Sequence, residues 1–442
     1  KMMQDPRPIN TNIKTKLINP EKEMKDTGIE WVGLIPKNWY IRPLYACLDE
    51  INQKNSPIVT MNILSLTNTD GVIPYSERGN QGNKSKENLE DYKVVYPNTI
   101  VANSMNILIG SVGLSKYEGC VSPVYYVYSA KSQIDIRYMN YLFQTEPFQK
   151  RLRQFANGIL EIRLRVSSHD ILHQKVAVPD YDEQQVIADY LDETCSQINE
   201  IIEEVKASID EYKELKQAVI FEAVTKGLDK NVEMKESTIE NLESIPSNWE
   251  IRRIATLYEE SKETGREDLP ILMVSINTGI SEGEVGDDDR IRKVVRSEDK
   301  SVYKVVHRND LAYNMMRAWQ GGFGAAQVEG LVSPAYVVAR PKCELDSRYV
   351  EALLRTPIFT EKIRGLSYGV ADFRLRLYWT YFKNLRICFP PLEEQRQIAD
   401  FITAESKKLD ALIHEKLELV VELEAYKKSL IYEVVTGKRR VV

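Results

Sequence analysis

The sequence predicts a mixed α/β protein of the α+β type, in which a globular domain followed by one long helix occurs twice. Three observations predict it. Two stretches, at about 182–226 and 393–437, contain no Gly or Pro before their last turn and repeat apolar residues at helical spacing. The regions before them are rich in β-branched and aromatic residues, in short runs bounded by Gly, Asn and Asp, which is typical of strands. The two halves also align with each other at a nearly constant offset.

The two predicted helices carry the clearest part of this repeat. Equivalent residues such as Ile187 and Ile398 lie 211 positions apart. Apolar steps of three and four residues average close to the coiled-coil repeat of about 3.5, and the first stripe continues through Leu215. At about 1.5 Å per residue, each helix is roughly 60 Å long. Because a helix with this acidic outer face cannot bury its stripe alone, we expect the two copies to pair as an intramolecular antiparallel coiled coil, with a pseudo-twofold relation between the halves.

The repeat also sets the expected domain boundaries. A chain of 442 residues is too long for one compact core and suggests several domains. The predicted parts are an N-terminal arm at 1–23, a globular domain at 24–180, a long helix at 181–230, a second globular domain at 234–390 and a second long helix at 391–437.

Both globular regions are predicted to share one scaffold. Each opens with Ile-Pro-x-Asn-Trp, at residues 35–39 and 245–249, which predicts a turn that leads into a first strand. Further on, the offset grows from 210 to 211, and the sequence Tyr-Lys-Val-Val recurs unchanged at 92–95 and 303–306. Each half then ends in a strand followed by proline and by acidic residues in the first turn of the helix, where they complement the helix dipole.

Composition and charge narrow the function. No apolar run reaches the roughly 18 residues needed to cross a bilayer, so we expect no membrane association. Five scattered cysteines without a CxxC pair predict a reducing, cytoplasmic setting and no zinc site. The net charge of −6 argues against nucleic-acid binding only on average, because residues 182–214 hold eleven acids and two lysines, whereas 290–317 hold eight Arg or Lys and three acids. This segregation suits a protein that contacts a polyanion with its globular parts, although a merely solvated acidic helix would look the same.

No catalytic motif stands out. The sequence lacks a GxxxxGK(S/T) phosphate loop, a GxGxxG turn after a strand and a GxSxG nucleophile turn. His169 and His173 have the spacing of a metal pair, but no third ligand is evident, and Thr380 and Asn384 occupy the aligned positions. We therefore expect no catalytic residue and no metal site.

The candidate binding residues lie in loops that differ between the two otherwise similar halves. Residues 73–90 and 281–300 occupy equivalent positions and share almost no sequence. The same is true of residues 105–111 and 316–322. One scaffold with two different polar tips is typical of two domains that recognise two different things. Lys and Arg suit phosphates, and Arg, Asn, Gln and Lys suit base edges. The candidates for DNA binding are Arg78, Asn80, Gln81, Asn83, Lys84, Lys86, Asn103 and Asn106 in the first half, and Arg290, Arg292, Lys293, Asn314, Arg317, Trp319 and Gln320 in the second.

An Arg-Leu-Arg segment, in contrast, is common to both halves. It comprises Arg163 and Arg165 in the first half and Arg374 and Arg376 in the second. Its presence in both suits phosphate contact rather than sequence reading. A salt bridge to the acidic start of the following helix explains it equally well.

From about Met24 to Gly437 the chain resembles the specificity (S) subunits of type I restriction–modification systems. The resemblance is carried by the two Ile-Pro-x-x-Trp motifs, by Val-Ser-Pro at 332–334, by Pro-Leu-Glu-Glu-Gln-Arg-Gln-Ile-Ala-Asp-Phe at 391–401 with its earlier version at 179–190, and by the two long helices. The order and duplication of these motifs are more specific than any one of them. In the first copy, Asp180-Tyr181-Asp182 replaces the usual Pro-Leu-Glu.

The resemblance implies a function that the residues alone do not. Each globular domain would be a target-recognition domain for one half of a bipartite, asymmetric site in double-stranded DNA. The helices would set the half-site spacing and dock two modification (methyltransferase) subunits. S-adenosylmethionine would belong to the modification subunits, and ATP and Mg to restriction (endonuclease and translocase) subunits where these join. This chain would then carry neither catalysis nor cofactor.

Two other classes of function remain open at this stage. The chain could be a scaffold whose coiled coil and domains bind proteins without reading DNA. A self-sufficient nuclease or methyltransferase is disfavoured by the missing motifs. The recognised DNA sequence does not follow from these residues.

Overall fold

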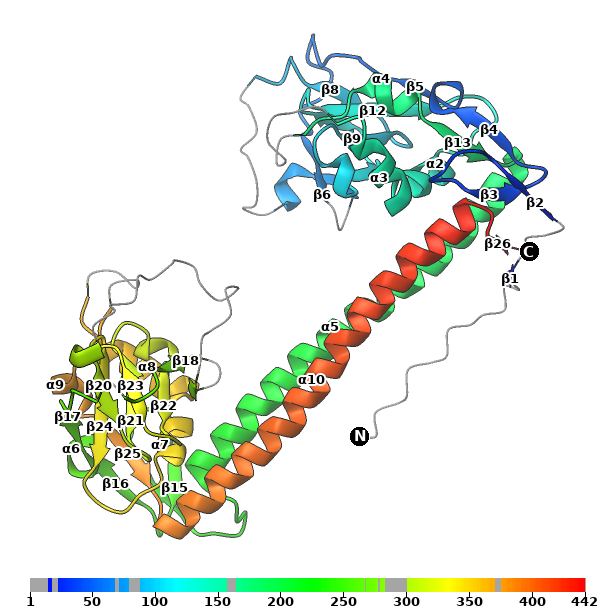
Figure 1. Ribbon diagram of the computed structural model, residues 1–442. Helices are drawn as coiled ribbons and strands as arrows, with labels where there is room; N and C mark the ends of the chain where they lie inside the picture. Colours follow the sequence, from blue (N-terminus) through cyan, green and yellow to red (C-terminus); the bar gives the residue numbers. More distant parts are fainter. Residues whose placement is uncertain are drawn as a thin grey trace. The chain divides into compact units, whose positions relative to one another are not determined.

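The structure is a computed structural model, and it describes residues 15–17, 23–67, 71–78, 88–156, 164–266, 268–276, 279–282, 300–369 and 375–441. The chain divides into two compact units (Figure 1). Unit 1 comprises Lys1–Lys206 with Glu418–Val442, and unit 2 comprises Ala207–Leu417. Each unit therefore holds one globular domain and one end of each long helix.

Unit 1 contains mostly short strands with a few helices. Its strands are β1 (Thr15–Leu17), β2 (Met24–Asp26), β3 (Leu34–Pro36), β4 (Tyr40–Pro43), β5 (Leu48–Glu50), β6 (Leu64–Thr67), β7 (Gly71–Pro74), β8 (Lys93–Val95), β9 (Ile100–Asn103), β10 (Val112–Leu114), β11 (Gly119–Val121), β12 (Tyr125–Ala130), β13 (Lys175–Val178) and β26 (Arg439–Val441). Its helices are η1 (Leu44–Ala46), η2 (Tyr75–Glu77), η3 (Asn106–Ile109), α2 (Ile136–Phe143), α3 (Glu146–Arg153), α4 (Ser168–Leu172), the first part of α5 (Tyr181–Lys226) and the last part of α10 (Leu392–Val435).

Unit 2 repeats this order. Its strands are β14 (Met234–Glu236), β15 (Ser244–Pro246), β16 (Glu250–Arg253), β17 (Tyr258–Ser261), β18 (Leu272–Ser275), β19 (Gly279–Glu282), β20 (Lys304–Val306), β21 (Leu311–Asn314), β22 (Phe323–Ala325), β23 (Gly330–Val332), β24 (Tyr336–Pro341) and β25 (Arg386–Phe389). Its helices are α6 (Ile254–Leu257), η6 (Lys300–Val302), η7 (Ala318–Gln320), α7 (Ser347–Leu354), α8 (Pro357–Leu366) and α9 (Trp379–Phe382), with the remaining parts of α5 and α10.

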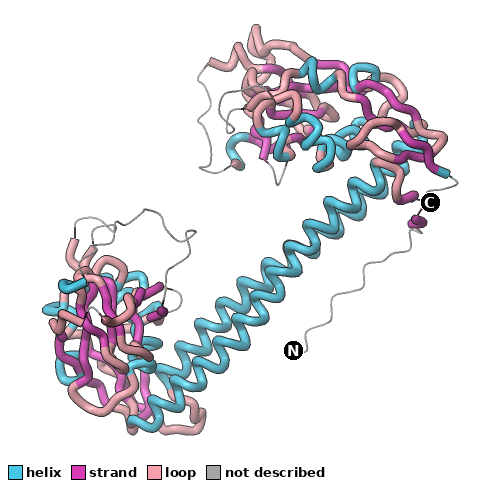
Figure 2. Tube along the Cα trace, in the orientation of Figure 1, coloured by secondary structure: helices cyan, strands magenta, loops and turns pink. Residues whose placement is uncertain are grey.

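Both globular domains are built on the same antiparallel sheet. The strand order is β10-β9-β12-β5 in unit 1 and β22-β21-β24-β17 in unit 2. In Figure 2 these short strands lie among loops and short helices, in contrast to the uninterrupted long helices. Alternating β-branched and aromatic residues bury one face of each sheet under the helices that follow it, so that Tyr138 of α2 and Tyr349 of α7 are fully buried. The expected α+β class and its internal repeat are confirmed.

A buried glutamine fixes the start of each long helix to its domain. In unit 1, Gln184 Oε1 accepts a hydrogen bond from the backbone N–H of Asp135 (2.9 Å), and its Nε2 donates to the carbonyl of Pro179 (2.9 Å). In unit 2, Gln395 makes the same pair of bonds, with Asp346 N–H (3.0 Å) and Pro390 O (2.8 Å). The repeated Glu-Gln at each helix start is therefore explained by the junction it forms between strand, helix and domain.

A buried tyrosine attaches each domain to the end of the other long helix. Tyr138 Oη donates to the carbonyls of Ala177 and Val435, both at 2.9 Å. Tyr349 Oη donates to the carbonyls of Cys388 (3.0 Å) and Val224 (3.1 Å). Each globular domain thus packs on the beginning of one long helix and the end of the other, so residues far apart in sequence complete one unit.

Within each unit, α5 and α10 lie side by side and antiparallel. In unit 2, Lys216 pairs with Asp410 at 2.7 Å, and Lys416 lies over the ring of Tyr212 at 5.6 Å, so the numbers rise along one helix as they fall along the other. In unit 1, Lys427 Nζ donates to Asn199 Oδ1 at 2.8 Å. The expected antiparallel pairing is confirmed. Fewer residues of the predicted apolar stripe of α5 are buried than expected. Ile198 and Ile209 are buried, but Leu215 is 47% exposed. None of the helices in the described part of the chain is long and apolar enough to cross a membrane.

Candidate nucleic-acid interface

Each four-stranded sheet ends in one short turn where the two domains differ. Tip turn 1 (residues 103–111) joins β9 to β10 through η3, and tip turn 2 (314–322) joins β21 to β22 through η7. Both contain a glycine in the left-handed region, Gly110 at φ 87° and Gly321 at φ 88°, where a side chain would strain the backbone. The two turns therefore share a backbone design, and their other side chains are free to differ.

The asparagine that opens each turn has a structural task. Asn103 Oδ1 accepts the backbone N–H groups of Met105 (3.0 Å) and Asn106 (3.3 Å), and the residue is only 7% exposed. Asn314 Oδ1 accepts the N–H of Met316 at 2.9 Å and is half-buried. The prediction that Asn103 faces DNA is therefore wrong, because this side chain holds the turn. Asn314 also holds its turn, and its half-buried side chain is only partly accessible to DNA.

Around tip turn 1 the structure gathers three of the predicted residues. Asn106 is exposed on the turn itself. Arg78 follows η2, and its guanidinium lies 5.6 Å from the centre of the Tyr75 ring. It also lies near Tyr125. Burial raises the pKa of Tyr125, and the positive charge of Arg78 offsets part of that rise. Arg165 is exposed, and its neighbour Val166 donates its N–H to the carbonyl of Ser104 at 3.0 Å. Tip turn 1 and Arg165 thus form one surface.

Tip turn 2 has the same arrangement with different chemistry. Arg317 and Gln320 are exposed on the turn, and within the described residues Arg317 makes no ion pair. Arg376 is also exposed. It lies beside tip turn 2 because the N–H of its neighbour Leu377 donates to the carbonyl of Met315 at 2.8 Å. Trp319, predicted as a DNA-binding residue, has a structural contact instead. Its Nε1 donates to Met316 O at 3.0 Å, and its half-buried ring lies 5.7 Å from the guanidinium of Arg364, so it anchors the turn to α8.

The remaining candidates lie outside the described residues: Asn80, Gln81, Asn83, Lys84, Lys86, Arg163, Arg290, Arg292, Lys293 and Arg374.

Two further points concern residues that the sequence argument missed or misassigned. Ile109 (65% exposed) and Met316 (45%) are apolar side chains on the tip turns, suited to contact with a thymine methyl group. The proposed salt bridge to the helix start is made by Arg137, with Asp189 (2.6 Å) and Asp192 (2.9 Å), and not by Arg165 or Arg376 among the described residues. The available signal was an arginine two residues after the Asp N-cap of α2.

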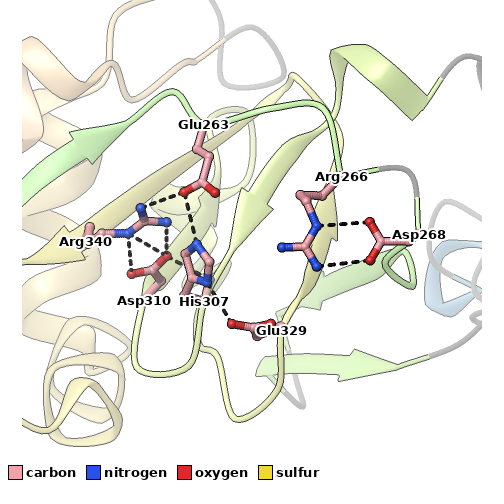
Figure 3. A network of polar contacts seen from close by, with 7 residues as sticks. All are labelled: Glu263, Arg266, Asp268, His307, Asp310, Glu329 and Arg340. Atoms are coloured by element: carbon pink, nitrogen blue, oxygen red, sulfur yellow. Dashed lines mark hydrogen bonds and ion pairs between the residues drawn. The ribbon is translucent and has the colours of Figure 1, made fainter.

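A polar network in unit 2 holds the turn that follows β20 (Figure 3). Arg340 bonds to Asp310 (3.0 Å) and Glu263 (2.8 Å), and the ring of His307 lies between Glu263 (3.0 Å) and Glu329 (2.8 Å). The bond to Glu329 raises the pKa of His307, with Glu263 adding to the rise. Arg340 and His307 in turn lower the pKa of Glu263. The positive and negative charges of the network pair with one another. The network is therefore structural and does not resemble a set of acid–base catalysts.

The histidine pair of unit 1 is a ring stack. His169 and His173 have ring centroids 3.9 Å apart at an interplanar angle of 28°, and Nδ1 of His173 is within hydrogen-bonding distance of the carbonyl of His169 (2.8 Å). Stacking places ring faces rather than nitrogen lone pairs against each other, which is not the arrangement of two ligands on one metal ion.

Comparison with known proteins adds the family. Residues 48–211 match the family model described as "Type I restriction modification DNA specificity domain". The chain is similar to two proteins of Methanocaldococcus jannaschii that are named as specificity subunits of type I restriction enzymes. The MjaX protein is 23% identical over 95% of this chain and 97% of its own length, and the MjaVIII protein is 22% identical over 92% and 94%.

Solved structures agree on the fold. A chain from work on complex assembly and conformational transition of the type I R-M system is 13% identical and superposes with a TM-score of 0.65, covering 91% of this chain and 99% of that one. The HsdS subunit of Thermoanaerobacter tengcongensis is 13% identical, with a TM-score of 0.51 and coverage of 91% and 98%.

These matches define the class first: the protein carries a DNA specificity domain on the fold of type I restriction–modification components. Over most of its length the chain is similar to specificity subunits of type I restriction enzymes, and residues 48–211 match their DNA specificity domain. The resemblance seen in the sequence is confirmed.

Proposed function

We propose that this chain is a non-catalytic subunit that gives a type I restriction–modification complex its DNA sequence specificity. Each globular domain, at 24–180 and at 234–390, binds one half of a bipartite, asymmetric site in double-stranded DNA. The observation that carries this proposal is the pair of tip turns. They have one backbone design and an exposed arginine beside each, Arg165 or Arg376, but Asn106 stands in one where Arg317 stands in the other. Common phosphate contacts and different base contacts are what two half-sites of unlike sequence require.

The rest of the complex follows from the same proposal. Two modification subunits dock on the chain and carry out adenine methylation with S-adenosylmethionine. Restriction subunits, where present, cleave DNA with ATP and Mg. The paired α5 and α10 set the spacing between half-sites, and the complex works in the cytoplasm. What supports this part is the similarity of the chain to specificity subunits of type I restriction enzymes.

Exchange of one domain tests the proposal. β4 and β13 are paired strands in which Tyr40 lies opposite Val178, so the two ends of the segment between them meet at one place. The segment includes Asp135 and Tyr138, which contact the long helices, so the segment taken from a homologous subunit must keep Asp and Tyr at these positions to preserve the junction. In the complex with modification subunits, mapping of methylated positions is expected to show one changed half-site and one unchanged half-site.

Other outcomes point elsewhere. A change in both half-sites would show that the two domains do not read DNA independently. A chain whose DNA affinity is absent, or insensitive to salt, would instead favour the protein-binding scaffold, because contacts to phosphates make affinity fall steeply as salt rises.

A further inference from the structure

Unit 2 contains a polar pocket away from its tip turn. The pocket has a volume of about 290 Å³ and lies where the turn after β20 meets the beginnings of α7 and α10. Its polar lining comprises three arginines and one acid, with two amide side chains: Arg308, Arg348, Arg396, Asp346, Asn309 and Gln327. A pocket with three arginines is suited to an anion.

Within the described residues, one of the three arginines makes no ion pair. Arg348 is held by Asp346 at 2.6 Å and by Asp400 at 2.7 Å. Arg396 has only a long contact of 3.8 Å with Glu393, and the two side chains are 56% and 75% exposed, so this pair is weak. Arg308 is exposed, and among the described residues its side chain makes no hydrogen bond or ion pair. Three arginines and one acid, Asp346, line the pocket, so its lining keeps an excess of positive charge, and Arg308 is the arginine available to a ligand.

The backbone on both sides of Arg308 is fixed. Asp310 accepts the backbone N–H of His307 at 2.9 Å and is itself bound by Arg340, as Figure 3 shows. Asn309 has a left-handed backbone (φ 68°), and its amide bonds to Leu345 O and Ser347 N–H, both at 2.8 Å. Binding by Arg308 would consequently order little more than one side chain, which keeps the entropic cost low.

The arginines are not needed to build this turn. Unit 1 has the same turn, with Asn98 at φ 61° and its N–H bonded to Ser115 O at 2.8 Å, as Asn309 N–H bonds to Ala326 O. There, however, Pro97 and Gln185 stand at the positions of Arg308 and Arg396. The scaffold forms without these charges, so their presence in unit 2 calls for another explanation.

We propose that this pocket binds a phosphate group, with Arg308 as its principal ligand. The planar guanidinium donates two parallel N–H groups to phosphate oxygens, and Arg396 and Gln327 contribute further donors. The phosphate comes either from the DNA backbone or from free phosphate in solution. The first source rests on the proposed function, whereas the second does not.

The test compares Arg308→Gln with Arg253→Gln in the full chain. Arg253 is an exposed arginine at the end of β16 that does not line the pocket, so the control removes the same charge elsewhere. One arm titrates inorganic phosphate at constant ionic strength by calorimetry. The other measures the salt dependence of DNA affinity. Equal unfolding midpoints of the two variants in chloride buffer would show that both are folded.

The outcomes separate the sources. If free phosphate binds, Arg308→Gln is expected to weaken it by about tenfold or more, with Arg253→Gln unchanged. If the site takes DNA, Arg308→Gln makes the negative slope of log affinity against log salt less steep by about 0.9, the loss of one phosphate contact, and Arg253→Gln does not. Equal behaviour of the two variants in both arms would overturn the proposal. A chain that binds no DNA would contradict the proposed function but leave the phosphate arm decisive.

Discussion

The two globular domains use equivalent positions for opposite kinds of polar chemistry. In unit 1, Tyr96 donates its hydroxyl to Gln53 Oε1 at 3.0 Å, a bond between neutral groups. In unit 2 the same positions hold His307 and Glu263, whose side chains meet at 3.0 Å and join the charged network of Figure 3. The strands that carry them match in order and pairing. Backbone geometry is therefore shared between the domains, whereas the charge placed on it is not.

A second pair of sites follows the same rule. Glu50 in unit 1 accepts the hydroxyl of Ser168 at 2.5 Å and lies 3.5 Å from Lys93. In unit 2, Trp379 stands in place of Ser168, and Glu260 borders a pocket lined by aromatic rings, among them Tyr368 (71% exposed). The buried anchors Gln184 and Gln395, and Tyr138 and Tyr349, in contrast, match. The two domains thus keep the contacts that join them to the long helices while their exposed polar sites diverge, as two readers on one scaffold require.

The largest expected difference between the domains lies in their tip turns. Arg317→Ala is expected to cost about 1–3 kcal/mol of discrimination at one half-site only, if Arg317 reads a base edge. Asn106→Ala, the equivalent change in tip turn 1, should affect the other half-site alone. Binding to DNA sets with single-base changes in each half-site measures both.

A different pattern would alter the assignment. If Arg317→Ala weakened binding to every sequence equally, Arg317 would contact a phosphate. If both variants affected the same half-site, the assignment of one domain to each half-site would fail.

The junctions between domain and helix end are expected to differ in tolerance. Gly437 (φ 69°) and Gly227 (φ 76°) follow the ends of α10 and α5. A Cβ on Gly437 would lie 2.4 Å from the rigid ring of Pro36, whereas on Gly227 it would meet the flexible end of Glu394 at 2.9 Å. Gly437→Ala should therefore cost about 2–3 kcal/mol of unfolding free energy, and Gly227→Ala about 1 kcal/mol. Urea denaturation of both variants measures the two losses of unfolding free energy. Equal losses would show that the strain of the left-handed backbone, and not the clash with Pro36, determines the cost.

The sequence predicted the architecture better than the contacts within it. The long helices and strands follow from periodicity, and the position of the tip turns follows from comparison of the two halves. The tasks of Asn103 and Trp319 did not follow, because each depends on a partner that the local sequence does not specify: backbone N–H groups in a turn, and Arg364 on α8. The same is true of Leu215, which fits the apolar spacing of the stripe but is exposed.

The smallest expected effect concerns pH and separates the charged network from its neutral counterpart. The pKa of His307 is raised by Glu329 and Glu263, so His307 binds its proton more tightly in the folded chain than in the unfolded chain, where the pKa is about 6.5. Its contribution to stability is thus fully present below the unfolded pKa and is lost as pH rises through the folded pKa. The residues are partly exposed, so the contribution is expected to stay below about 1 kcal/mol.

His307→Gln and Tyr96→Phe provide the matched pair for this prediction. Urea unfolding between about pH 5.5 and 8.5 is expected to show His307→Gln less stable than the wild type at the acidic end, with the difference shrinking as pH rises. Tyr96→Phe removes the neutral bond to Gln53, and its difference from the wild type should not change across this range. A difference for His307→Gln that stays constant or grows with pH would mean that the ring acts through packing and not through its charge.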